Sequence, residues 1–198
     1  MAINVPDGVE DAENVRKQFL KDYIGNTIPE TPQEIYRTVL TIYSEYVMNY
    51  HTLKVAQETA KIQGAASPVY LYRFDHHNPK SFSWIRFFMQ LTDATHCTEL
   101  AYLFKKGTIW GFTFLEDDLK MTETFSTAFT QFAKTGNPNI AVDDGSSHGL
   151  VADWRPLNVA NPERHMIFDL SCHSSDSFFD GRPAKVMKYV EEAARNKA

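Results

Sequence analysis

Three features are missing from this 198-residue sequence: long apolar runs, an excess of basic charge and a dense set of cysteines. The longest apolar stretch, residues 100–104, is far shorter than the roughly 20 residues that a membrane-spanning helix needs. The net charge of −5 argues against nucleic acid or an anionic membrane surface as partner, because both require a basic patch. The sequence therefore predicts neither a membrane span nor nucleic-acid binding.

Cysteine and histidine are too sparse or wrongly spaced for a disulfide framework or a metal centre. Cys97 and Cys172 are the only cysteines, and we interpret them as free thiols. The adjacent His76 and His77 lack the spacing of metal-binding histidine pairs, so we predict no metal. A secretory signal and a glycosylation sequon are also absent from the sequence as given, which favours an intracellular location only weakly.

The remaining composition, with 43% hydrophobic and 13% aromatic residues, is that of a folded protein rather than a disordered one. The best helix start is Thr31-Pro32-Gln33-Glu34, a capping box with proline at the first helical position. Apolar residues at helical spacing predict helices over residues 11–24, 31–46, 50–63, about 119–135 and 184–195. Residues 98–104 are expected to form a short helix or turn.

Only two segments, residues 69–74 and 166–170, are β-branched or aromatic runs that predict strands. Two strands do not make an independently stable sheet. We therefore expect an incomplete sheet in a helix-rich chain, whose missing strands lie elsewhere.

Several motifs, in the right order, resemble one family. His96 to Phe104 is similar to the H-G-x-E-L-x-Y-x-F stretch of type-B carboxylesterases, the cholinesterase-like α/β-hydrolases. Phe132 to Asn139 resembles their F-A-K-T-G-x-P-N signature, and residues 154–156 and 166–170 resemble the turn and strand that follow it. Residues 45–56 and 69–74 resemble the helix and strand that precede the histidine. The resemblance implies that residues 1–198 form the C-terminal portion of a carboxylesterase type-B domain.

This resemblance assigns roles to particular residues. His96 corresponds to the general base of a Ser-His-Glu triad, which takes the serine proton and returns it to the leaving alcohol. Glu99 is expected to be a polar anchor behind the histidine. The aromatic residues Trp84, Phe87 and Phe88 are candidates for the substrate pocket wall, although core packing explains them equally well. The family hydrolyses small-molecule carboxylic esters without a cofactor.

Three positions depart from the family pattern. Cys97 follows the histidine where the family usually has a small residue, and Phe129 stands where it typically has tryptophan. Tyr50 occupies the place of a disulfide cysteine in many secreted members, so that disulfide is absent.

The chain lacks the other catalytic groups. Gly145-Ser146-Ser147-His148-Gly149 matches G-x-S-x-G, but no buried strand precedes it and no helix follows, so we reject Ser147 as nucleophile. The triad acid of the family lies further before the histidine than this chain extends, and the oxyanion hole belongs to the missing part. We therefore expect the chain alone to be inactive.

Three interpretations stay open on the sequence. The chain is a truncated or partial form of a complete serine esterase, a genuine short relative, or a non-catalytic binding or adhesion protein of the neuroligin type. Retention of His96 argues against the third interpretation, because non-catalytic relatives often lose triad residues.

Overall fold

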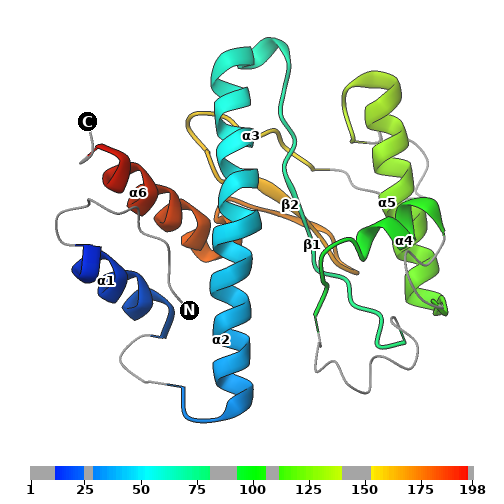
Figure 1. Cartoon of the computed structure of the whole chain (residues 1–198). Helices are drawn as coiled ribbons and strands as arrows, with labels where there is room; N and C mark the ends of the chain where they lie inside the picture. Colours follow the sequence, from blue (N-terminus) through cyan, green and yellow to red (C-terminus); the bar gives the residue numbers. More distant parts are fainter. Residues whose placement is uncertain (1–11, 25–28, 81–92, 106–111, 140–152, 196–198) are drawn as a thin grey trace. The chain divides into compact units, whose positions relative to one another are not determined.

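A computed structural model describes residues 12–24, 29–80, 93–105, 112–139 and 153–195 (Figure 1). The chain divides into two compact units, one made of residues 1–62 with 177–198 and the other of residues 63–176. The first is called the helical unit and the second the sheet unit. None of the described helices is both long and apolar enough to cross a membrane.

The helical unit begins with α1 (Ala12–Ile24) and α2 (Pro32–Ser44). A π-helical turn, η1 (Glu45–Asn49), joins α2 to α3 (Tyr50–Gln63), and the three run on as one long rod (Figure 1). The chain returns to this unit at the short 3-10 helix η4 (Phe178–Gly181) and α6 (Arg182–Arg195). The helices predicted over residues 11–24, 50–63 and 184–195 are confirmed with small shifts of their ends.

The start of α2 confirms the capping box predicted from the sequence. The Thr31 hydroxyl accepts a hydrogen bond from the Glu34 amide at 3.2 Å, and the Glu34 carboxylate accepts one from the Thr31 amide at 3.0 Å. These bonds hold the Glu34 carboxylate in its charged form and lower its pKa. Two backbone donors that a helix start leaves unpaired are thereby satisfied.

The core of the helical unit is small and aromatic. Phe19, Ile42, Tyr50 and Val186 form its buried cluster. The ring of Phe19 packs edge-on against Tyr189 with centroids 5.8 Å apart, which joins α1 to α6. Burial of these four side chains is what holds the helices of this unit together.

Among the described residues of the helical unit, one carboxylate is buried. Glu45, in the π-helical turn, has 1% of its surface exposed and accepts hydrogen bonds from Arg182 Nε at 3.1 Å and Asn49 Nδ2 at 3.3 Å. Burial raises the pKa of Glu45, although the Arg182 guanidinium opposes that rise. The loss of hydration therefore outweighs the attraction of the cation at this site.

The sheet unit contains a three-stranded sheet in the order β1-β2-β3. β1 (Tyr72–Phe74) pairs in parallel with β2 (His165–Phe168), and β2 pairs antiparallel with β3 (His173–Ser175). A short 3-10 turn, η2 (Gly64–Ala66), precedes β1. Parallel strands need a crossover connection, and that connection contains α4 (Glu99–Phe104) and α5 (Glu116–Thr135). The incomplete sheet in a helix-rich α/β chain confirms the expected fold class.

The core of the sheet unit gathers aromatic rings from the sheet and from α5. Phe125 and Phe168 are fully buried, with centroids 4.9 Å apart, and Trp154 packs on Phe168 at 5.3 Å. Phe129, which replaces the family's tryptophan, lies 4.5 Å from Phe125 and 5.4 Å from Tyr72. Phenylalanine at this position therefore still fills the core beside β1.

The segment after α5 explains why its residues form a recognisable signature. Gly136 ends the helix in a left-handed conformation, with φ of 74°, and its amide donates to the Phe132 carbonyl at 2.7 Å. Asn139 then bonds the Trp154 backbone twice, through Nδ2 to the carbonyl at 2.9 Å and through Oδ1 from the amide at 2.6 Å. These hydrogen bonds connect the segment after α5 to Trp154, which packs against β2.

Candidate active site

The turn that carries His96 is held by its own threonine residues. The Thr95 amide donates to Thr98 Oγ1 at 3.2 Å, and Thr98 Oγ1 donates to the Thr95 carbonyl at 2.7 Å. The backbone adds a bond from the Thr98 amide to the Thr95 carbonyl at 3.1 Å. The His96 side chain itself is exposed, so its imidazole is open to a partner or substrate on that side of the turn.

Cys97 has a left-handed backbone, with φ of 66°. An L-residue with a Cβ pays about 1–2 kcal/mol in this conformation, whereas glycine adopts it freely. The turn that presents His96 therefore stores backbone strain in this chain.

Glu99 opens α4 and is half-buried. Burial raises the pKa of Tyr72, the first residue of β1, to about 12, and electrostatic repulsion by Glu99 adds to the rise. The expected role of Glu99 as an anchor for the histidine stays a prediction.

Two other predicted features lie outside the described residues. Trp84, Phe87 and Phe88, the candidate pocket wall, fall within residues 81–92. The rejected serine motif, Gly145 to Gly149, falls within residues 140–152. Both interpretations stay predictions.

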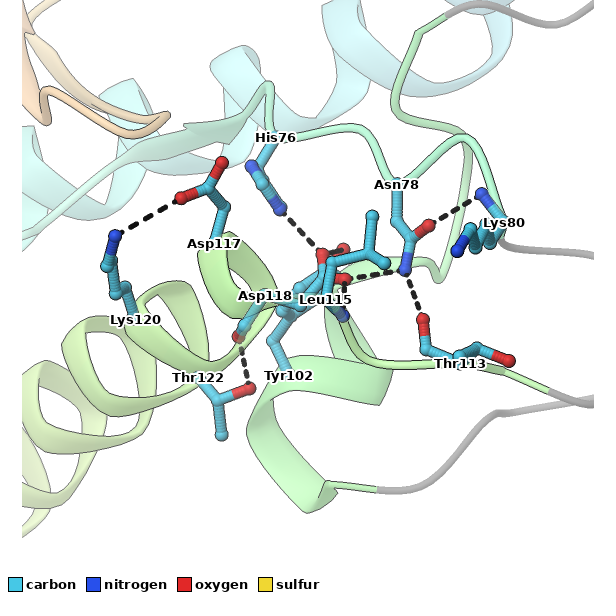
Figure 2. A network of polar contacts seen from close by, with 10 residues as sticks. All are labelled: His76, Asn78, Lys80, Tyr102, Thr113, Leu115, Asp117, Asp118, Lys120 and Thr122. Atoms are coloured by element: carbon cyan, nitrogen blue, oxygen red, sulfur yellow. Dashed lines mark hydrogen bonds and ion pairs between the residues drawn. The ribbon is translucent and has the colours of Figure 1, made fainter.

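A buried carboxylate, Asp118, lies in the first turn of α5 and accepts four hydrogen bonds (Figure 2). Its Oδ1 accepts from His76 Nε2 at 2.8 Å and from the Tyr102 hydroxyl at 2.9 Å. Its Oδ2 accepts from Asn78 Nδ2 and from the Leu115 amide, both at 2.6 Å. These five residues are called the Asp118 centre. They come from the loop after β1, from α4 and from the start of α5.

The chemistry of the Asp118 centre follows from its donors. Asp118 has 1% of its surface exposed, and a carboxylate loses its hydration when buried. A carboxylate oxygen can only accept hydrogen bonds, so His76 Nε2 is the donor in its bond to Asp118. Burial raises the pKa of Tyr102, and the bond to Asp118 raises it further, so this hydroxyl stays a donor. The four bonds replace the water that Asp118 gave up.

Sequence reasoning missed the Asp118 centre. It placed the start of α5 near Leu119, one residue after Asp118, and it considered His76 only as a metal ligand. Among the described residues, no group of three or more histidine, cysteine, aspartate and glutamate side chains is arranged to hold a metal ion. One local signal of the role of Asp118 was available in the sequence. Asp118 lies three positions after Leu115, and a carboxylate at the third helical position accepts a hydrogen bond from the amide of the residue before the helix.

The chain matches the model of the Carboxylesterase family over residues 2–184. It belongs to the carboxylesterase family. It is 30% identical to esterase cest-33 of Caenorhabditis elegans over 178 residues, which is 89% of this chain and 30% of that protein. It is 27% identical to the medium-chain fatty acyl-CoA hydrolase precursor of Anas platyrhynchos, over 76% of this chain and 24% of that protein. The chain thus spans less than a third of the curated relatives it matches.

Solved structures agree on the fold. The carboxylesterase EST55 of Geobacillus stearothermophilus, at pH 6.2, superposes with a TM-score of 0.60 and 24% identity, over 90% of this chain and 32% of that one. The juvenile hormone esterase of Manduca sexta, with OTFP covalently attached, gives a TM-score of 0.63 and 17% identity over 92% of this chain and 32% of that one. The fold is therefore that of part of an α/β-hydrolase.

Proposed function

We propose that this chain is the C-terminal part of a serine carboxylic ester hydrolase and that it contributes the triad histidine, His96. The observation that carries the proposal is an exposed imidazole on a braced turn in front of α4, in a chain of the carboxylesterase family. The substrate of the complete enzyme would be a small-molecule carboxylic ester.

The chemistry assigned to His96 needs an imidazole that is accessible and held in place. A general base must come within about 2.6–3.2 Å of the proton that it takes. The exposed side chain meets the first requirement, and the bonds between Thr95 and Thr98 support the second. Serine, acid and oxyanion donors would come from the part of the enzyme that this chain does not contain.

The chain alone should therefore have no esterase activity, because removing the nucleophile and the oxyanion hole removes most of the rate enhancement. The test is hydrolysis of p-nitrophenyl acetate by the purified 198-residue chain. Release of p-nitrophenol at the rate of a blank supports the proposal. Turnover that disappears in Ser147→Ala would mean that the Gly145 to Gly149 segment is a working nucleophile.

Sequencing the transcript upstream of the Met1 codon separates the proposal from a non-catalytic binding protein. An upstream G-E-S-A-G-type motif on a strand-turn-helix segment, followed by an acidic residue in the proper order, establishes the esterase. A continuous reading frame that replaces that serine with a non-nucleophilic residue contradicts it.

A further inference from the structure

We propose that Asp118 is a positioning residue for His96: its carboxylate, acting through Tyr102, fixes α4 and the turn that carries the imidazole. The inference rests on the proposed role of His96 as the general base. It assigns a purpose to the Asp118 centre, which lies outside the residues that the family motifs pick out.

The His96 turn continues directly into α4 through backbone hydrogen bonds. The Leu100 amide donates to the Cys97 carbonyl at 3.3 Å, and the Ala101 amide donates to the Thr98 carbonyl at 3.2 Å. The orientation of the turn is therefore the orientation of α4. A helix of six residues is not stable by itself, so contacts with its surroundings must hold it.

Tyr102 supplies the polar part of that hold. It lies six residues after His96, has 1% of its surface exposed, and packs its ring against Phe74 at 5.0 Å and Phe112 at 5.6 Å. Ring packing leaves a helix able to slide or rotate slightly, whereas a hydrogen bond fixes one atom. The bond from the Tyr102 hydroxyl to Asp118 Oδ1, at 2.9 Å, provides such a fixed point (Figure 2).

Asp118 can serve as a fixed point because another segment, the loop after β1, also holds it. His76 and Asn78 bond it from the loop that leaves β1, and the loop is itself tied to β2 by the amides of Asp75 and His76, which donate to the Phe168 carbonyl at 2.8 and 3.1 Å. Asn78 also donates to the Thr113 carbonyl at 2.9 Å. Hydrogen bonds through Asp118 and the loop after β1 thus connect the Tyr102 hydroxyl to the sheet.

A different role explains part of the same geometry. The bond from the Leu115 amide to Asp118 is the carboxylate half of a capping box, and a negative charge is favourable at a helix start. A pure capping role would stabilise α5 and the fold without changing the order of the His96 turn. The two roles therefore predict different behaviour of the His96 turn when Asp118 is replaced, under conditions in which the chain is still folded.

Cys97 is a natural probe of that turn, because the chain already carries a thiol there. Its thiol is half-buried beside His96, so local opening of the turn exposes it. Cys172, in the same unit, is an internal reference, because burial raises its pKa to about 11 and keeps its reactive thiolate scarce. The experiment measures the rates at which iodoacetamide modifies both thiols in the native 198-residue chain, by peptide mass spectrometry.

The variants are Asp118→Ala and Tyr102→Phe. Their matched controls are Asp117→Ala, the same change at the exposed neighbour, and Tyr70→Phe, which removes a hydroxyl from a half-buried ring of the same unit. We expect Asp118→Ala to speed modification of Cys97 about tenfold and Tyr102→Phe several-fold, by local opening, with Cys172 unchanged. The controls should leave both rates as they are.

Each other outcome overturns the inference. Equal acceleration of both thiols would show that Asp118 supports the fold as a whole, and an unchanged Cys97 rate in the two variants would show that the turn does not depend on it. Tyr102→Phe removes a single oxygen, so it decides the matter if Asp118→Ala does not fold. The inference would also be contradicted if both thiols of the unaltered chain reacted as fast without urea as in urea. Thiol modification does not depend on catalysis. A failure of the proposed function would therefore appear in a different experiment, as normal acylation of the complete esterase that carries His96→Ala.

Discussion

Asp118 and Glu45 are both 99% buried carboxylates, but the two units of the molecule accommodate them differently. In the sheet unit, Asp118 accepts four hydrogen bonds, from an imidazole, a phenol, an amide side chain and a backbone amide. In the helical unit, Glu45 accepts bonds from Arg182 and Asn49, and burial still raises its pKa.

The comparison shows two ways of pairing a buried carboxylate. At Glu45, a partly exposed guanidinium and one side-chain amide bond the two oxygens, and the effect of burial on the pKa still exceeds theirs. At Asp118, four donors share the two oxygens, and they also connect three segments of chain. The Asp118 centre is therefore called the junction, because it joins three segments. Glu45 and Arg182 are called the pair, because they join two helices.

The largest expected effect is at the junction. Asp118→Ala removes the acceptor of four hydrogen bonds, three of them buried, and we expect it to lower the free energy of unfolding by about 3–5 kcal/mol. Urea denaturation followed by tryptophan fluorescence measures this, since Trp154 lies in the same core. Asp117→Ala should leave the midpoint nearly unchanged. A loss no greater than that of the control would show that the four bonds contribute little.

A smaller effect is expected at the pair. Arg182→Met keeps most of the side-chain length but removes the charge that faces Glu45, and we expect it to lower the free energy of unfolding at neutral pH by about 2 kcal/mol. Part of that loss should be recovered in acid, where Glu45 takes up a proton. A loss that is the same at neutral and acid pH would mean that packing, rather than charge, is what Arg182 contributes.

Relief of strain beside the junction should stabilise the sheet unit by about 1 kcal/mol. Cys97→Gly removes the Cβ from a residue whose φ is 66°, and thermal unfolding should show a higher midpoint. Cys97→Ala is the matched control, since it removes the thiol and keeps the Cβ. If both variants gain equally, the thiol and not the backbone is the source of the strain.

The smallest effect is a change in pH dependence. A carboxyl group whose pKa is raised by folding makes the protein most stable below its unfolded value, near 4.5, and loses that contribution as pH rises through the folded value. The unaltered chain should therefore lose some stability as pH rises above 4.5, and Glu45→Gln should remove that decline. Chemical denaturation at a series of pH values measures it. An unchanged decline in Glu45→Gln would assign it to another group.

Local patterns predicted much of this fold. The Thr31 capping box, the Gly136 helix end and the segments of β1 and β2 all depend on residues close together in the sequence. By contrast, β3 has the polar sequence His173-Ser174-Ser175, which carries no strand pattern, and it forms because β2 offers it an edge.

The Asp118 centre could not be predicted in the same way. His76 and Asn78 lie 42 and 40 residues from Asp118, and Tyr102 lies 16 residues away, so only the packed fold brings them together. Asp118 alone resembled an ordinary acidic residue at a helix start. His96 was accessible to sequence reasoning because its neighbours along the chain, rather than in space, carry the family motif.

The role of His96 is tested most directly by acylation of the complete esterase of which this chain is proposed to be the C-terminal part. The measurement is the rate of covalent modification of the nucleophilic serine by a fluorophosphonate, with His173→Ala, a change at another exposed histidine, as control. We predict that His96→Ala lowers this rate by about three powers of ten or more while the melting temperature and the control rate stay unchanged. A near-normal rate in His96→Ala would contradict the assignment of the general base.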